Sequence, residues 1–271
     1  MKKLGVLPGP DEAQDMNVTK AVPHKNNLLA ALPSQDFEAL SARLEFLEMP
    51  ENASLEVAHE PIDFVYFIET GVASIVASSP TNLKIEIGLV GFEGMSGASI
   101  VLGDTENPFD CYMQIAGTAH RVATDDFVEL LSASRSMERF FMKYSRLLAI
   151  QNGYTTLAAG KVKFENRLAR WLLMLHDRMQ GDHFNVTHDF LALMLGSHRP
   201  AATIALQVLE GEGAIRNNRK SVLIRDRALL ERIAGGTYGL AEREYERLIG
   251  RPVMRTHWVP SHVDTELQRQ V

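Results

Sequence analysis

Between residues 187 and 220 the sequence gathers basic, hydroxyl and amide side chains of the kind that contact nucleic acids. Arg199 is the best candidate for reading a base, because a guanidinium group can bridge O6 and N7 of guanine in the major groove. Basic and small polar side chains also suit the phosphate backbone, which positions a protein without reading sequence. The candidate DNA-contacting residues are Thr187, Ser197, His198, Arg199, Thr203, Arg216, Asn217, Asn218, Arg219 and Lys220.

The elements around these residues would position them for such contacts. Thr187 can cap a short helix that stops at Gly196, and a second helix is expected over 198–209. Two helices joined by a short glycine-containing turn are typical of a helix-turn-helix, whose second helix presents its N-terminal side chains to base edges. Two strands joined by a turn at Asn217–Asn218 would follow as a wing. A solvated basic hairpin could explain the wing alone, but the order of all these elements favours a DNA-binding module.

Charge is distributed unevenly along the chain of 271 residues. The net charge of −6 by itself argues against a nucleic-acid partner. Residues 1–159 carry a net charge of −10, residues 160–233 carry +4, and residues 234–271 are neutral. An acidic first part and a basic second part predict two domains with different partners.

Residues 26–135 have the pattern of a β-rich domain. A helix is expected over 36–47 with Ser34 as its N-cap, and short alternating strands with turn signals follow. One apolar run is expected to break at Glu69–Gly71, and a later one is expected to form a strand pair that turns at Gly117. Many short strands at this spacing predict a β-barrel or β-sandwich.

A long amphipathic helix is expected over 136–161, starting at Ser136. Apolar and small polar residues recur along it at alternating intervals of four and three, which is a heptad pattern. Such a seam favours a dimer, while the alternative is a helix packed on its own domain. Because the apolar face is wide, the helix could also pack on the β-rich domain and on a second copy at once. The seam residues are Met137, Phe141, Tyr144, Leu148, Gln151 and Thr155.

Several classes of protein are excluded or disfavoured by the sequence. The chain has one cysteine, so it cannot form an intrachain disulfide or by itself hold a four-cysteine cluster. No metal site is expected, and the common catalytic motifs are absent, so the chain is not expected to be an enzyme. The pairs His176–Asp177 and His188–Asp189 are expected on helix surfaces. No apolar run reaches the roughly 18 residues of a membrane span and the N-terminus lacks a signal-peptide core, so we expect a cytoplasmic protein without a membrane partner.

Taken together, residues 27–235 resemble the Crp/Fnr family of bacterial transcription regulators. The stretch LGSHRPAATIALQVLEGEGAI is similar to the family's helix-turn-helix, and Arg199 falls on its first base-reading arginine. The family's neighbouring glutamate is Pro200 here, and its later base-reading arginine is Ile204. The family's usual operator is therefore not expected to carry over unchanged.

The resemblance also covers the β-rich domain. The segment GFEGMSG, residues 91–97, looks like the start of the family's effector-binding cassette, and we call it the cassette. It supplies the candidate effector-binding residues Gly91, Phe92, Glu93 and Gly94, where Glu93 either binds an effector hydroxyl or is a solvated turn residue. Cyclic-nucleotide-binding members grip the phosphate with an Arg-Ser pair, but the matching region here reads Asn107-Pro108-Phe109. The resemblance therefore favours neither a cyclic nucleotide nor an iron–sulfur cluster, and the cofactor stays unknown.

The resemblance implies an α+β fold in five parts. These are an N-terminal arm (1–25), a jelly-roll-like β-roll sensor domain (26–135), a dimerisation helix (136–161), a winged helix-turn-helix domain (162–250) and a C-terminal tail (251–271). It implies a homodimeric regulator that reads a pseudo-palindromic operator in double-stranded DNA, with RNA polymerase as a further partner. The alternative is a cyclic-nucleotide-type sensor that acts through protein partners.

Overall fold

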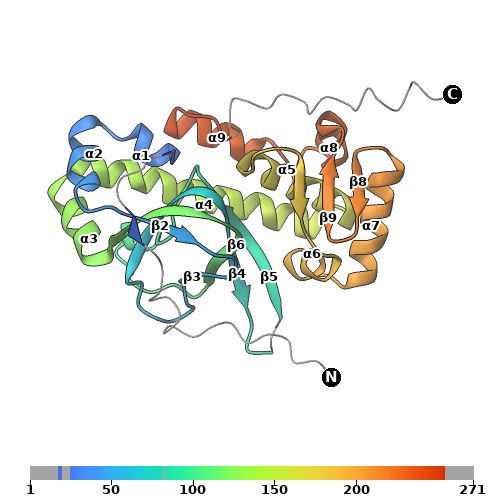
Figure 1. The fold of residues 1–271 in the computed structure, drawn as a ribbon, viewed down its shortest axis with the longest axis horizontal. Coiled ribbons are helices and arrows are strands. Elements are labelled where there is room, and N and C mark those ends of the chain that lie inside the picture. Colours follow the sequence, from blue (N-terminus) through green and yellow to red (C-terminus); the bar gives the residue numbers. More distant parts are fainter. Residues whose placement is uncertain (1–17, 20–24, 82, 254–271) are drawn as a thin grey trace.

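The structure is a computed structural model that describes residues 18–19, 25–81 and 83–253. A β-rich domain forms the N-terminal part and a smaller helical domain with its own sheet forms the C-terminal part (Figure 1). The long helix α4 (Arg135–Lys161) runs from one to the other. The α+β class with an N-terminal β-roll is thus confirmed. Across these residues, no helix is long and apolar enough to cross a membrane.

The β-roll is built on one antiparallel sheet. Its strand order is β1-β2-β6-β4-β5, and β3 also pairs with β6. Short helices cover its end, and their side chains share a core with those of the sheet (Figure 1). The elements are β1 (Val18–Thr19), α1 (Asn27–Ala31), α2 (Ser34–Ser41), β2 (Glu45–Met49), β3 (Ser54–Glu56), β4 (Phe64–Ser78), β5 (Lys84–Val90), a 3-10 turn (Ile100–Leu102), β6 (Asp110–Ala123) and α3 (Thr124–Ala133).

The two breaks expected in the strands are wrong, because β4 and β6 are each continuous. A Cβ atom on Gly117 would lie 1.9 Å from the Thr70 carbonyl oxygen, and one on Gly71 would lie 2.5 Å from that of Ile115. Register shifts between β4 and β6 occur at the same place. These glycines therefore permit a close approach of two bulged strands and do not mark turns.

The helix expected over 36–47 is also wrong in its second half. The helix α2 ends at Ser41 and its N-cap is Pro33, while residues 45–49 form β2. Leu47 pairs with Ala119 of β6 and is fully buried. Pairing with a long neighbouring strand has outweighed the local helical preference of leucine and glutamate.

The termini are described only at residues 18–19, 25 and 251–253 within the expected arm and tail. Val18 and Thr19 pair with Leu47 and Phe46 as the edge strand β1, so this part of the expected arm belongs to the sheet. The remainder of both segments lies outside the described residues.

The helix α4 begins one residue earlier than expected, and its cap is Ser134. The Ser134 hydroxyl accepts a hydrogen bond from the Met137 amide at 3.2 Å. The expected seam residues Met137 and Phe141 are fully buried in the β-roll core, where Phe141 packs against Phe67 and Phe127. They are therefore not free to meet a second chain.

The central seam residues also bind this chain's own β-roll. The Tyr144 hydroxyl donates to the Met95 carbonyl and accepts from the Met95 amide, both at 3.0 Å. The Gln151 side chain bonds both the amide and the carbonyl of Leu89. Leu148 and Thr155 are half-buried. The heptad pattern therefore marks the face that α4 turns to its own domain. The assignment as dimer contacts is wrong for the buried Met137, Phe141, Tyr144 and Gln151, and for the half-buried Leu148 and Thr155 it stays a prediction.

The C-terminal domain is a winged helix with a core of its own. Its elements are α5 (Phe164–Arg178), β7 (His183–Asn185), α6 (His188–Met194), α7 (Arg199–Gly211), β8 (Ile215–Asn218), β9 (Ser221–Ile224) and α8 (Arg227–Ile233). The sheet order is β7-β9-β8. Leucines of α5 and α7 fill the core beneath it.

The last helix, α9 (Leu240–Ile249), packs into the core of the β-roll and not into that of the winged helix. Its residues Tyr245 and Ile249, with Val253 after it, join the β-roll core. In Figure 1 it lies along α4, between α1 and α5. The helical module that carries the helix-turn-helix therefore ends before α9, and the expected span of 162–250 is too long.

Candidate nucleic-acid interface

The helix-turn-helix is formed by α6 and α7. The Thr187 hydroxyl caps α6 by accepting from the Phe190 amide at 3.2 Å. Gly196 turns the chain with a φ of 60°, a conformation that favours glycine. His198 is the N-cap residue of α7 and Pro200 lies in the first turn, where its missing N–H is not needed. Local sequence signals thus fix this turn.

One face of α7 is buried and the other is open. Ala202, Ala205, Leu206 and Leu209 pack into the winged-helix core. Arg199 lies at the exposed N-terminal end, with 66% of its side chain accessible. Its contact to Asp189 is 3.6 Å long and solvent-exposed, so it costs little to break. The guanidinium is therefore free to reach a base edge.

Two further residues lie on the open face. Ile204, at the position of the family's later base-reading arginine, is 60% exposed. Gln207 is also exposed and was missed by the sequence analysis, although it follows Arg199 and Thr203 at intervals of four, so helical periodicity was the signal. A glutamine can bond adenine at N6 and N7, and an apolar side chain can contact the thymine methyl group.

Thr203 has a different contact from the one expected. Its hydroxyl donates to the Arg199 carbonyl at 3.0 Å and lies 2.9 Å from Nδ1 of His188. The side chain is half-buried. In this structure it holds α6 against α7.

The wing reverses at a different place from the one expected. Asn217 and Asn218 lie in β8 and pair with Val222 and Ser221 of β9. The turn is made by Arg219 and Lys220, and Lys220 has a φ of 66°. Both turn residues are exposed, as are Arg216 and Asn218, whereas Asn217 is half-buried. Placing the turn two residues later puts its two basic side chains at the tip of the hairpin.

A buried polar network fixes the elements behind this face. The Arg227 guanidinium donates to Asp177 at 2.8 Å and to the Tyr238 hydroxyl, and His176 lies 2.9 Å from Asp182. Burial raises the pKa of Asp177 to about 6, and Arg227 opposes that rise. Burial also lowers the pKa of His176. The expectation that His176–Asp177 is a surface pair is wrong, since both side chains are in the core.

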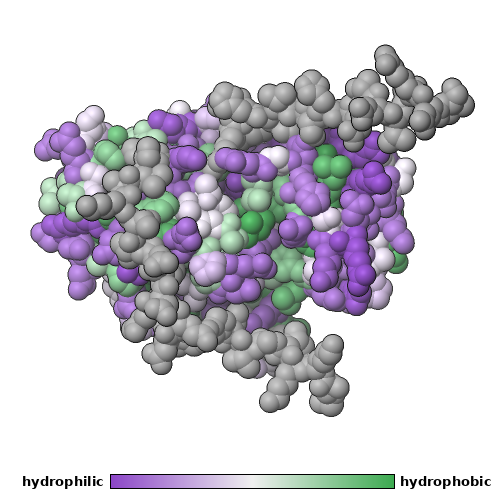
Figure 2. All heavy atoms as spheres, in the orientation of Figure 1, coloured by the Kyte–Doolittle hydropathy of each residue, from purple (hydrophilic) through white to green (hydrophobic). Residues whose placement is uncertain are grey.

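Hydrophilic side chains predominate over the end of the molecule formed by β8, β9 and α7 (Figure 2). Among them α7 also exposes the apolar side chains of Ile204 and Val208. Ser197 and His198 directly precede α7, which begins at Arg199, and they lie in the same domain as the basic wing tip, so the candidate residues share one module. Among the described residues no group of acidic, histidine or cysteine side chains could hold a metal ion.

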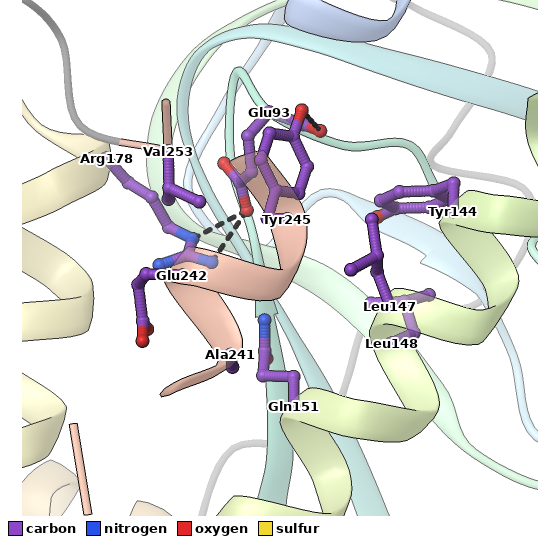
Figure 3. Close-up of a pocket in the computed structure, with 10 residues that line it drawn as sticks. All are labelled: Glu93, Tyr144, Leu147, Leu148, Gln151, Arg178, Ala241, Glu242, Tyr245 and Val253. Carbon is purple, nitrogen blue, oxygen red and sulfur yellow. Dashed lines mark hydrogen bonds and ion pairs between the residues drawn. The ribbon is translucent and has the colours of Figure 1, made fainter. Parts of the chain in front are cut away.

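The expected effector residues are neither open nor solvated. The Glu93 side chain is 4% exposed and forms an ion pair with Arg178 of α5, with Oε1 2.7 Å from both Nε and a terminal nitrogen (Figure 3). The Gly91 amide donates to the other Glu93 oxygen at 3.1 Å. The expectation of a solvated turn residue is thus wrong, because Glu93 forms a buried contact between the β-roll and the winged helix.

Comparisons with known proteins agree with this architecture. Residues 166–233 match the model of the Crp-like helix-turn-helix domain. The cyclic AMP receptor protein of Thermus thermophilus is 32% identical over 132 residues, which cover 44% of this chain and 60% of that protein, less than two thirds of its length.

Solved structures show the same fold at low identity. A Crp/Fnr-family protein from Eubacterium rectale has a TM-score of 0.63 at 15% identity, covering 78% of this chain and 99% of that one. FixK2 from Bradyrhizobium japonicum has a TM-score of 0.61 at 14% identity, covering 70% and 96%.

Fold and site together define a β-roll protein with a winged helix-turn-helix. The domain match and the shared architecture confirm the resemblance to the Crp/Fnr family of transcription regulators.

Proposed function

We propose that this chain is a sequence-specific DNA-binding transcription regulator that acts as a homodimer. The observation that carries the proposal is the open N-terminal face of α7, which begins at Arg199 and lies in the same domain as the basic tip of the wing. In this arrangement α7 enters the major groove and the wing follows the phosphate backbone.

Three exposed side chains of α7 have a stated role in this proposal. Arg199 reads a guanine, Gln207 reads an adenine and Ile204 contacts a thymine methyl group. Arg219 and Lys220 neutralise phosphates, together with Arg216 and the amide of Asn218, so affinity falls with salt concentration. Contact of the bound dimer with RNA polymerase is a further expectation.

The dimer is proposed to form through the face of α4 that the β-roll leaves open. Exposed residues recur there at intervals of three and four, and Met142 and Leu157 on this side are each 44% accessible. A Cβ atom on Gly153 would meet nothing within 4 Å, so a second helix could approach closely. The residues of this open stripe are Arg139, Met142, Arg146, Ala149, Gly153 and Thr156. Two copies related by a twofold axis would read half-sites about one helical turn apart.

The test is selection of genomic fragments by the purified protein, followed by titration of the selected site in fluorescence anisotropy. We expect Arg199→Ala to weaken binding to the selected site by about 1–3 kcal/mol and to relax the sequence specificity at one base position. Arg135→Ala, an exposed arginine at the far end of α4, is the matched control and should bind normally. Equal weakening on all sequences would make Arg199 a phosphate contact only.

The alternative, a sensor that acts through protein partners, has one observation in its favour. Leu193, Ile204 and Val208 expose apolar surface on the helix-turn-helix. Failure to select any specific fragment at moderate salt would favour that alternative over the DNA-binding proposal.

A further inference from the structure

The cassette is the part of the β-roll where a small-molecule effector was expected, and its polar groups already have partners within the chain. We propose that α9 of the same chain fills the effector-binding place beside the cassette, so that no diffusible effector binds there. The occupation of the cassette by α9 can be tested without DNA. Only the expected effect of a ligand on affinity for DNA rests on the proposed function.

The first partner comes from the winged helix. Arg178, at the end of α5, binds Glu93 through two nitrogens and also donates to the Met174 carbonyl at 2.7 Å. Both charged side chains are almost fully buried, at 2% and 4% exposure. Buried charges persist when they are paired and hydrogen-bonded, and this pair meets both conditions. A ligand that used the Glu93 carboxylate would first have to displace Arg178.

The second partner is α9 itself. The Tyr245 hydroxyl donates to the Glu93 backbone carbonyl at 2.6 Å. Its ring packs in the same core as Tyr144 and Leu147 of α4, so α9 fills the space between the cassette and α4 (Figure 3). The remaining cavity is about 20 Å³, which is room for one water molecule. A nucleotide-sized molecule does not fit while α9 is docked.

The third partner occupies the other end of the cassette. The carboxylate of Glu56 accepts from the Gly97 amide at 2.7 Å and from the Asn107 side chain at 2.6 Å. Asn107 belongs to the segment that replaces the expected phosphate-gripping pair. A carboxylate therefore already takes the donors that an anionic group would need, and its negative charge opposes a second anion.

The docking of α9 is secured after its C-terminal end, while Glu242 caps the start of the helix by accepting from the Gly239 amide at 2.9 Å. After the helix, the Pro252 carbonyl accepts from Asn27 at 2.9 Å, and Arg251 donates to the Ala30 carbonyl at 2.8 Å. Since α9 follows directly from the winged helix, its docking ties that domain to the β-roll. Release of α9 would loosen the cassette and the domain contact together.

The test is hydrogen–deuterium exchange of the full chain, read on the peptide that spans residues 89–97. Tyr245→Phe keeps the ring and removes the hydroxyl, so we expect exchange in this peptide to rise about fivefold, as for the loss of one buried hydrogen bond. The double variant Tyr245→Ala with Ile249→Ala should raise it further, while α7 and the wing stay protected. Arg247→Ala is the control, because Arg247 pairs with Glu244 on the exposed side of α9.

Unchanged exchange in both tyrosine variants would overturn the proposal, since α9 would then not hold the cassette. Loss of protection throughout the double variant would indicate unfolding, and Tyr245→Phe would then decide the outcome alone. A second measurement adds millimolar cyclic AMP, as a probe, to wild-type protein on its selected DNA. We expect no change in affinity, and a rise of about tenfold, within the usual range of allosteric coupling, would also overturn the proposal. If wild-type protein binds no specific DNA while the exchange result holds, only the proposed function fails.

Discussion

Loss of the Arg178 guanidinium tests whether the two domains depend on one buried ion pair. In Arg178→Met the side chain keeps a similar length, but the Glu93 carboxylate stays buried without its cation. Removing one partner of a buried pair costs about 3–5 kcal/mol. We therefore expect a loss of about 3–5 kcal/mol in the free energy of unfolding at pH 7.

The assay is urea denaturation followed by circular dichroism at pH 7. Adding Glu93→Gln removes the buried charge, so the double variant should be more stable than Arg178→Met at pH 7. Arg247→Met, on the surface of α9, serves as the control. The reasoning is refuted if the double variant loses as much as the single one, or if the single loss is below about 1 kcal/mol.

Three further predictions concern other parts of the molecule. Burial raises the pKa of the Glu86 carboxyl to about 7, compared with its ordinary value of 4.5 in the unfolded chain. Between pH 4.5 and 7 the folded chain therefore keeps a proton that the unfolded chain has released. The free energy of unfolding should therefore fall by up to about 3 kcal/mol as pH rises from 4.5 to 7, and Glu86→Gln should flatten that slope in urea titrations at a series of pH values. Gly117→Ala places a methyl group against the Thr70 carbonyl and should destabilise by about 1–3 kcal/mol, whereas Gly211→Ala, with open space around it, should not; equal melting temperatures would contradict this. Met142→Glu on the open stripe of α4 should weaken a dimer at least about tenfold in sedimentation, while Leu83→Glu at an exposed position on the β-roll should not; a Met142→Glu protein that stays dimeric would contradict the stripe.

The Glu86 carboxyl lies in a buried hydrogen-bond network. The Ser74 hydroxyl lies 2.7 Å from one Glu86 oxygen and 2.5 Å from the Gln114 side-chain oxygen. One hydroxyl proton cannot serve both acceptors, and the buried Gln114 amide nitrogen has no partner in this orientation. Either a proton on Glu86 or a turn of the Gln114 amide, whose nitrogen would then donate to Ser74, resolves the conflict. The Trp171 indole donates to the other Glu86 oxygen at 2.7 Å.

The helix-turn-helix could be predicted from sequence because its signals are local. Thr187 caps one helix, Gly196 supplies the left-handed turn, and Pro200 fits the first turn of the next helix. Each signal acts within a few residues, so no knowledge of the remaining fold was needed. The recognition face could have been read further, to Gln207, by following the same helical period.

The missed features depend on contacts between distant segments. Residues 45–49 form a strand only because β6 pairs with them, and Gly117 is required only because Thr70 lies across from it. Glu93 and Arg178 are 85 residues apart and each looks like a surface charge in the sequence. The heptad on α4 was real, but periodicity alone does not say whether a helix buries its stripe against its own chain or against a copy.

The turn of the helix-turn-helix has a neighbour outside its own domain. A Cβ atom on Gly196 would lie 2.8 Å from the end of the Ile85 side chain in β5. The strand β5 therefore limits how closely α6 and α7 can approach the β-roll. In a twofold assembly, a larger side chain at either position would change the distance between the two copies of α7. The spacing of the half-sites that such a protein accepts would then be encoded partly in the β-roll, a domain outside the helix-turn-helix.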